Sequence, residues 1–264
     1  MNLNLPINEL LKGSQNKQEL KSLLRQAELG VNSWEPIFSN FISAPLREEF
    51  FEKIKLIDDV YCLSNGGYVG AERQRISFEK KSETRLKEKI LPPIKAINIE
   101  GNFLFDRAEK NDFINSINAL GASYETLGDL WLIRDRGAQL ICTPDTAIQL
   151  DGKHGLVRGV EIIFENIEIN QLNLPFQRQP KKFSSVEAST RLDAIASAGF
   201  GISRSKIVNH IKSGNLRLNW LPIRQSSKSV TTGDRIQLEG KGSIELLKIE
   251  KTKRERWRVE MLRK

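Results

Sequence analysis

The sequence predicts an α+β protein in three parts: a helical N-terminal domain at residues 1–57, an α+β middle domain at 58–172, and a smaller domain of helices and a β-sheet at 185–264. Apolar residues recur at helical spacing in the N-terminal part. Short apolar runs between glycines, which are typical of strands, begin near Tyr61. Residues 173–184 hold Pro175 and Pro180 among polar and basic residues, which is the composition of a linker.

The clearest helix signal is an apolar stripe at i, i+3, i+4 and i+7, formed by Leu20, Leu23, Leu24 and Ala27. In the middle domain, strand patterns in "YCLSNGGYVG", "ERQRISFEK" and "PPIKAINIEGNF" precede a helix that ends at Gly121. Two strands, a short helix over Asp145–Leu150 and a last strand in "GVEIIFENIEI" follow. This order predicts a sheet with helices packed on it.

Two arginines of the middle domain are candidate phosphate contacts. If "ERQRISF" is a strand, Arg73 and Arg75 share one face, and their guanidinium groups project side by side. The alternative is a solvated basic edge that discourages pairing with another sheet. The overlapping "GGYVGAERQR" has neither P-loop spacing nor G-x-G-x-x-G before a helix, so we expect no nucleotide cofactor.

The positive charge of the chain is concentrated near its C-terminus. Residues 176–264 hold 20 basic and 8 acidic residues, a net charge of +12, whereas residues 1–175 have a net charge of −4. A basic block attracts polyanions, and without an apolar insertion helix a nucleic acid is favoured over a membrane surface. The alternative is charge that only keeps the protein in solution.

Two short helices are predicted after the linker. Thr190 and Asp193 form a pattern like a capping box at the start of the first helix, and Gly199 ends it. Ser203 caps the second helix, and Gly214 stops it. Their apolar residues are expected to share one small core, and they are Leu192, Ile195, Ala196, Ile207, Val208 and Ile211.

A polar and basic surface is predicted on the second helix and on "NLRLNW", where Leu216, Leu218 and Trp220 alternate inward. The outward residues of that strand are expected to continue the polar stripe of the helix, whose N-terminus favours a phosphate. A solvated helix face is the alternative. The candidate RNA-binding residues are Arg191, Ser203, Arg204, Ser205, Lys206, Asn209, Lys212, Asn215, Arg217 and Asn219, with Arg73 and Arg75 as further contacts.

The C-terminal motifs together resemble the S4 RNA-binding domain: Arg191-Leu192-Asp193, Gly199, Ser203-Arg204, Ile211-x-x-Gly214, Leu216-x-Leu218-Asn219 and Gly233-Asp234-x-Ile236. Trp220 stands where the family usually has glycine, so the local turn is expected to differ. Nearly the whole chain is similar to YlmH-type proteins, through Gly66-Gly67-Tyr68, Ala71-Glu72-Arg73, "GNFLF" and Gly128-Asp129. "VEASTRLDAIASAGFGISRSKIV" and "TKRERWRV" most resemble the cyanobacterial photosystem II S4 domain proteins.

The resemblance implies a helical first domain, a ferredoxin-like RNA-binding middle domain and an S4 domain at the C-terminus. It also implies association with the large ribosomal subunit and tRNA, including rescue of stalled translation. The photosystem name implies a role in assembly or expression of photosystem II.

The sequence argues against catalysis at Asp193. Enzymes that isomerise uridine and carry an S4 domain need a separate catalytic domain, and only 71 residues follow Asp193. We therefore expect a non-enzymatic protein that binds rRNA or tRNA at the ribosome without a cofactor or metal. The rivals are an RNA-modifying enzyme that uses the middle domain and a photosystem II assembly or expression factor.

The expected setting is a reducing compartment. Cys62 and Cys142 lie far apart and fit neither a disulfide framework nor a metal site, so buried thiols are expected. The start, "MNLNLPINELLKG", lacks a signal-peptide pattern, and no apolar run is long enough to span a membrane. We expect a cytoplasmic monomer.

Overall fold

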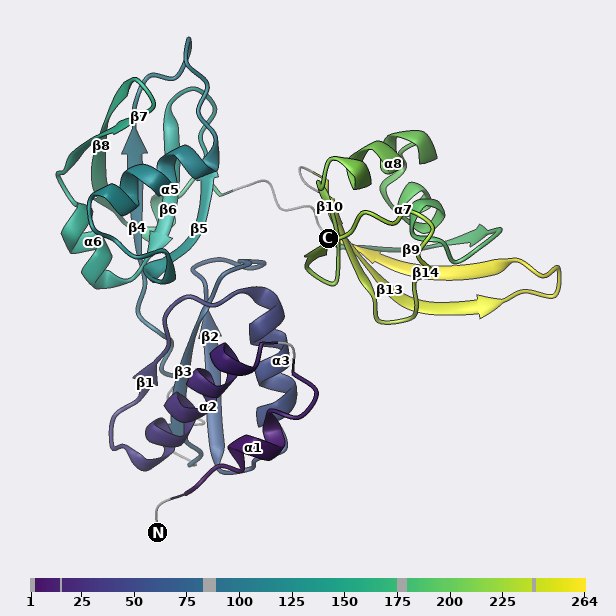
Figure 1. Cartoon of the computed structure of the whole chain (residues 1–264), viewed down its shortest axis with the longest axis horizontal. Helices are drawn as coiled ribbons and strands as arrows, with labels where there is room; N and C mark the ends of the chain where they lie inside the picture. Colours follow the sequence, from purple (N-terminus) through teal and green to yellow (C-terminus); the bar gives the residue numbers. More distant parts are fainter. Residues whose placement is uncertain (1–2, 15, 83–88, 175–179, 239–240) are drawn as a thin grey trace. The chain divides into compact units, whose positions relative to one another are not determined.

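The computed structural model describes residues 3–14, 16–82, 89–174, 180–238 and 241–264. The chain divides into two compact units, Met1–Pro175 and Phe176–Lys264 (Figure 1). Within the described ranges, no helix has both the length and the apolar character needed to cross a membrane.

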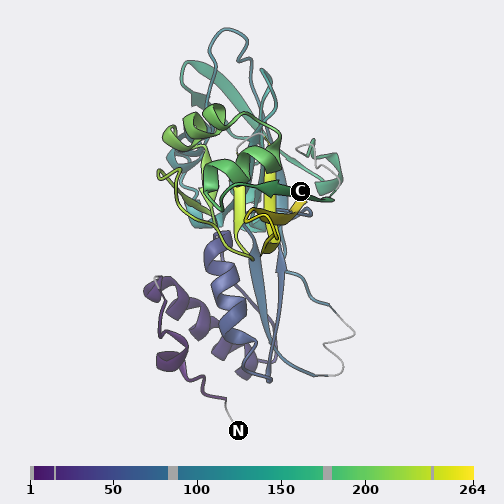
Figure 2. The same ribbon diagram turned by 90° about the vertical axis from the view of Figure 1, so that its right-hand side faces the viewer.

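The first unit begins with helices packed on a small antiparallel sheet. The helices are α1 (Ile7–Leu10), α2 (Lys17–Asn32) and α3 (Ala44–Ile54), and the sheet has the order β1 (Ile37–Phe38), β3 (Arg75–Lys80), β2 (Val60–Asn65). Figures 1 and 2 show α2 and α3 lying along the β2–β3 hairpin. The predicted stripe of α2 is buried in their common core, and Phe50 of α3 meets Phe78 of β3 edge to face, with ring centroids 5.6 Å apart. This helix prediction is confirmed.

The predicted boundary at residue 57 divides a packed region. β2 and β3, which we expected in the middle domain, form their sheet with β1 and share a core with α2 and α3. Helix α2 lies so close to β3 that a Cβ on Gly30 would overlap the carbonyl oxygen of Phe78. The helical N-terminal region therefore includes a small sheet, and its packed core extends beyond residue 57. Sequence periodicity could identify the strands but not the sheet they join.

The rest of the first unit is a five-stranded antiparallel sheet with the order β5-β6-β4-β8-β7. Its elements are β4 (Lys95–Glu100), α5 (Lys110–Ala119), η1 (Tyr124–Thr126), β5 (Leu127–Leu132), β6 (Gly137–Cys142), α6 (Pro144–Leu150), β7 (His154–Val157), β8 (Val160–Ile167) and η2 (Ile169–Gln171). The β-α-β-β-α-β order confirms the ferredoxin-like prediction. Helices α5 and α6 share one core with one face of this sheet. The short strand β7 was not predicted.

The second unit places two helices, α7 (Leu192–Phe200) and α8 (Arg204–Lys212), on one face of a six-stranded antiparallel sheet. The strands, in sheet order, are β11 (Leu221–Pro222), β10 (Leu216–Leu218), β12 (Arg235–Leu238), β13 (Gly242–Lys251), β14 (Trp257–Arg263) and β9 (Lys181–Glu187). Strand β9 pairs with β14, so the predicted linker at 173–184 extends too far. Residues 175–179 of that linker lie outside the described residues.

The helix ends differ in detail from the prediction. Arg191 is the N-cap residue of α7, and no side chain caps it, so the predicted capping box is wrong. Gly199 lies inside α7, where a Cβ would overlap Ile244 of β13, and Gly201 ends the helix with a φ of +67°. Ser203 occupies the predicted N-cap of α8, but its hydroxyl makes no capping bond.

The strand that carries Trp220 also ends earlier than predicted. Leu218 pairs with Leu221, so Asn219 and Trp220 form a two-residue hairpin turn, with φ values of +50° and +71°. The guanidinium of Arg235 lies 4.1 Å from the Trp220 ring centroid and covers it. Trp220 therefore lies in the turn, with a backbone conformation that favours glycine, and is not part of the strand. Its ring packs against the guanidinium of Arg235.

Candidate nucleic-acid interface

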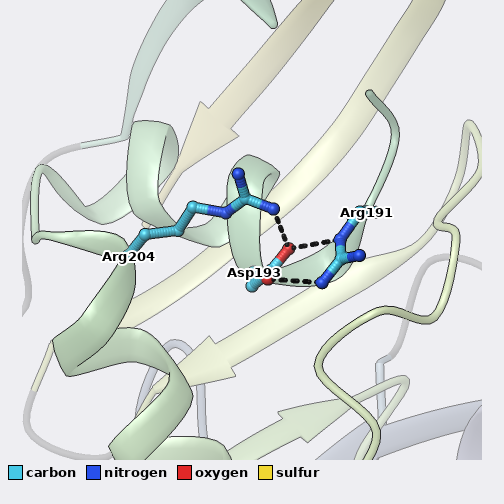
Figure 3. A network of polar contacts seen from close by, with 3 residues as sticks. All are labelled: Arg191, Asp193 and Arg204. Carbon is cyan, nitrogen blue, oxygen red and sulfur yellow. Dashed lines mark hydrogen bonds and ion pairs between the residues drawn. The ribbon is translucent and has the colours of Figure 1, made fainter. Parts of the chain in front are cut away.

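A buried carboxylate holds two arginines where α7 and α8 begin. Asp193, in the first turn of α7, is 4% exposed. Arg191 donates to both of its oxygens, from Nε to Oδ1 at 3.1 Å and from Nη2 to Oδ2 at 2.9 Å, and Arg204 Nη2 donates to Oδ1 at 3.0 Å. Figure 3 shows the two guanidinium groups meeting at the carboxylate. Their side chains are 43% and 53% exposed, so two oriented cations lie at the surface.

The arginines also keep Asp193 ionised. Burial alone would raise its pKa, but the hydrogen bonds from Arg191 and Arg204 and their positive charges outweigh burial, and the pKa of Asp193 lies below its ordinary value. The Asp193 backbone N–H donates to Ser226 O at 3.1 Å, which ties the start of α7 to the loop at 223–231. Asp193 has a structural role, as predicted, but as the centre of this ion cluster rather than as a helix cap.

The exposed face of α8 carries the predicted polar stripe. Ile207 and Ile211 are fully buried against the sheet, and Val208, predicted for the core, is half-buried. The exposed residues at the start of α8 and along it are Ser203, Arg204, Ser205, Lys206, Asn209 and Lys212. Their side chains are accessible, and the first turn of α8 adds backbone N–H groups that favour an anion.

Two basic residues beside this cluster were missed at the level of sequence. Arg224 and Lys228 are exposed in the loop at 223–231. That loop is held against the start of α7 because Leu192 N donates to Lys228 O at 2.8 Å and Val230 N donates to Thr190 O at 2.9 Å. The run "IRQSSKSV", with two basic residues among polar ones, is a signal that could have identified them.

A second group of basic residues lies at the tip of the long β13–β14 hairpin, which extends from the body of this unit in Figure 1. Lys253, Arg254 and Arg256 are exposed there, and Lys251 forms an ion pair with Glu255 at 3.6 Å. These charges belong to the motif "TKRERWRV", and the sequence alone does not indicate which surface they occupy.

Two of the three candidate residues around β10 do not continue the helical stripe. Leu216 and Leu218 face the helices, so the half-buried Arg217 between them points to the opposite face of the sheet. The side-chain amide of Asn219 donates to Asp234 Oδ1 at 2.7 Å and accepts from Arg235 N at 2.8 Å, so it stabilises the hairpin turn. Asn215 is exposed just after α8 and stays a candidate contact.

Comparison with protein families assigns both ends of the chain. Residues 15–82 match the family model described as "YlmH, N-terminal", and residues 190–236 match the model described as "S4 domain". The chain carries a YlmH N-terminal domain and an S4 domain. The S4 match covers the Asp193 cluster, α8 and the turn at Asn219, so the unit Phe176–Lys264 is called the S4 unit below.

Two individual proteins are also similar to this chain. The chain is 28% identical over 202 residues, 76% of its length and 77% of the relative's, to "Ribosome-associated protein quality control protein P2" of Bacillus subtilis. Among solved structures it is similar to "Cell division protein ylmH from Streptococcus pneumoniae", with 15% identity, a TM-score of 0.45, and coverage of 65% of this chain and 96% of that one. The family matches confirm the predicted YlmH and S4 resemblance. Closeness to the cyanobacterial branch stays a prediction.

The phosphate-binding role expected for two arginines within the YlmH N-terminal match is contradicted by their contacts. Arg75 is 8% exposed and donates to Ser39 O and Pro93 O, and burial lowers its pKa. Arg73 Nε donates to Leu127 O at 2.8 Å, and its guanidinium lies 4.2 Å from the Tyr124 ring centroid. Both guanidinium groups bind protein carbonyls between the two sheets of the first unit, so they are structural.

The YlmH motifs around Tyr68 and Asp129 meet at the same place. Asp129 accepts hydrogen bonds from the Tyr68 hydroxyl at 2.7 Å and from the backbone N–H groups of Glu72 and Arg73 at 2.7 and 2.9 Å. Burial, and next the charge of Asp129, raise the pKa of Tyr68. These contacts join the YlmH N-terminal domain to the ferredoxin-like sheet, which explains the motifs without a ligand.

The two cysteine thiols lie where burial disfavours their reactive, ionised form. Burial raises the pKa of Cys142 and of the half-buried Cys62 to about 12, so neither thiol is activated. In the ranges that the structure describes, no three His, Cys, Asp or Glu side chains gather as metal ligands would.

Proposed function

We propose that this chain is a non-enzymatic RNA-binding protein that holds rRNA or tRNA at the ribosome through its S4 unit. The observation that carries the proposal is the pair of arginines aligned by Asp193 beside the first turn of α8. A guanidinium has five N–H donors, so Arg191 and Arg204 keep donors for phosphate oxygens after they have bound Asp193. The net charge of +12 in residues 176–264 supports the same partner.

The arrangement works by recognition alone. Because Asp193 orients both guanidinium groups before RNA arrives, less side-chain freedom is lost on binding. Lys206, Lys212 and the loop residues Arg224 and Lys228 add positive charge along the backbone of the RNA. Three neutral side chains can reach 2′-hydroxyls or base edges, and these are Ser205, Asn209 and Asn215.

The contacts of Asp193 support a non-catalytic role for this residue. Its carboxylate is almost fully buried and accepts three hydrogen bonds from arginines, so it has little access to a substrate. The rival is an RNA-modifying activity of the middle domain. Incubation of the protein with bulk RNA, followed by nucleoside mass analysis, would reveal such an activity as a modified nucleoside that appears with time.

The finer assignment is to the large ribosomal subunit in the cytoplasm, in translation, rescue of stalled ribosomes or ribosome assembly. The name of the B. subtilis relative, a ribosome-associated quality control protein, supports it. A role in the assembly or expression of photosystem II rests on sequence resemblance and stays a prediction.

A salt titration tests the proposal. If about four phosphates are neutralised, the logarithm of the binding constant of labelled tRNA or an rRNA fragment should fall with the logarithm of salt concentration with a slope of roughly −3. Replacing Lys206 and Lys212 by serine should make that slope shallower by up to about 2. The matched control replaces Lys17 and Lys21, two exposed lysines of α2, and should leave it unchanged. Salt-insensitive binding, or an equal effect of the control, would contradict the proposal.

A further inference from the structure

The face of the ferredoxin-like sheet opposite α5 and α6 is partly covered by a second core, and it is poorly suited to RNA. RNA-binding domains of this type stack bases on sheet aromatics. Here Trp131 is 7% exposed, and its Nε1–H donates to Asn173 O at 2.9 Å in the segment that crosses the sheet. Glu100 and Glu165 lie on the same face, since they alternate with buried residues of β4 and β8. Acidic side chains would repel phosphates there.

A different surface of this domain has the required chemistry, at the end of the sheet where β4 ends. Three loops meet there, at residues 101–107, 133–136 and 157–160. Gly101 N donates to Arg136 O at 3.0 Å, and Phe103 N donates to Asp135 O at 2.8 Å. Asp106 forms an ion pair with Arg158 Nε at 2.8 Å. These contacts place the three loops side by side, and we call this surface the arginine tip.

The arginine tip displays an aromatic ring on an anchored loop. Phe103 is 3% exposed and packs on Phe113 of α5, with ring centroids 5.2 Å apart. Two positions later, Phe105 is 95% exposed, and Leu104 is 57% exposed. In Figure 1 the loop after β4 extends beyond the end of the sheet. The core therefore holds the base of the loop while Phe105 lies in solvent.

The charge of the tip is opposite to that of its unit. The three loops hold four arginines, Arg107, Arg134, Arg136 and Arg158, and two aspartates, so their net charge is +2, whereas residues 1–175 have a net charge of −4. All four arginine side chains are exposed. Arg134 and Arg158 have φ values of +49° and +56°, in the left-handed region that residues other than glycine rarely adopt. Arginine thus stands at two turn positions where glycine or asparagine is favoured.

We propose that the arginine tip is a second RNA site that binds an unpaired nucleotide, with the base stacked on Phe105 and the flanking phosphates bound by the surrounding arginines. An aromatic face stacks on any base, and arginine is suited to phosphate because its planar group donates in pairs. This inference rests on the proposed function. In it, the middle domain binds a single-stranded segment of the same RNA that the S4 unit binds.

The test uses the full chain and two labelled RNA probes, a blunt stem-loop and the same stem-loop with a single-stranded uridine extension. The extension should raise the affinity of the native protein. Phe105→Ala should lower affinity for the extended probe about tenfold and leave the blunt probe unchanged, while Phe105→Trp should retain binding. The matched control is Trp34→Ala, because Trp34 is 96% exposed in the same unit. Thermal melts should be unchanged in Phe105→Ala, since the side chain lies in solvent.

The outcomes separate this inference from the proposed function. If the native protein binds the blunt probe through Lys206 and Lys212, and Phe105→Ala binds both probes as the native protein does, the tip is not an RNA site and the S4 assignment stands. An equal loss of affinity for the extended probe in Trp34→Ala and in Phe105→Ala would also contradict the proposed site at the arginine tip. If the native protein binds neither probe, both proposals fall.

Discussion

Reversing the charge of Arg204 and of Lys212 in separate variants should distinguish two roles. Arg204 is expected to stabilise the S4 unit as well as bind RNA, whereas Lys212 is expected only to bind RNA. Both residues are exposed on α8, and the two substitutions to glutamate change the charge equally. Arg204 Nη2 donates to the buried Asp193 at 3.0 Å. In the part of the chain that the structure describes, Lys212 has no ion pair or side-chain hydrogen bond. From sequence alone the two positions were equivalent.

The expected difference follows from the Asp193 contact. A hydrogen bond between charged groups contributes roughly 1.5–3 kcal/mol, and because Arg204 is half exposed we take about 2 kcal/mol for its loss. For a unit the size of residues 176–264, each kcal/mol corresponds to about 4–8 °C, so Arg204→Glu should lower the melting temperature of the S4 unit by about 8–16 °C. Lys212→Glu should change stability by about 0.5 kcal/mol or less.

The assay combines thermal melts with RNA titrations below the melting transition of each variant. Both variants should bind RNA more weakly, but only Arg204→Glu should melt early. An Arg204→Glu variant as stable as the native protein would refute the view that Asp193 and its arginines stabilise the fold. Normal RNA binding by folded Lys212→Glu would refute the predicted surface of α8.

Two further predictions concern the carboxylates that hold each unit together. Because the pKa of Asp193 is lowered in the folded protein, its ionised form stabilises the S4 unit above the unfolded value of about 3.9, and this contribution is lost as pH falls through the folded pKa. Below about pH 4 the native protein should therefore lose stability more steeply than Asp193→Asn, and parallel acid denaturation curves would contradict this. Asp129→Ala should destabilise the first unit by roughly 2–3 kcal/mol, because it removes the acceptor for Tyr68 and two backbone N–H groups, without changing the salt dependence of RNA binding. Equal denaturation midpoints for Asp129→Ala and the native protein would exclude that role.

Local patterns in the sequence were enough to predict most elements. The stripe from Leu20 to Ala27 and the buried Ile207 and Ile211 follow helical spacing, and each is buried where the period requires. The strand order of the middle sheet agrees with the ferredoxin-like fold, which the resemblance to YlmH-type proteins implied and which local patterns alone did not specify. Whether a segment forms a helix or a strand depends largely on residues close to it in the sequence. Hydrophobic periodicity reports this local information.

The predictions were wrong where contacts with residues distant in the sequence determine the role of a side chain. Arg73 and Arg75 have the pattern of a phosphate-binding strand. Their guanidinium groups instead donate hydrogen bonds to backbone carbonyl oxygens such as Leu127 O, which lie far away in the sequence. Gly199 resembled a helix end, whereas it is glycine because Ile244 packs against it. Composition and spacing do not record such contacts, so the structural arginines could not be distinguished from the exposed ones in advance.

The most direct test of the central claim is ultraviolet crosslinking of the native protein in its own cells, with sequencing of the bound RNA and mass spectrometry of the crosslinked peptides. We expect rRNA or tRNA to be the main RNA, with crosslinks in the segment 190–231 that contains Arg191, α8 and the Lys228 loop. Recovery of no RNA above the background of an Arg191→Glu/Lys212→Glu variant, or crosslinks confined to residues 1–175, would contradict it.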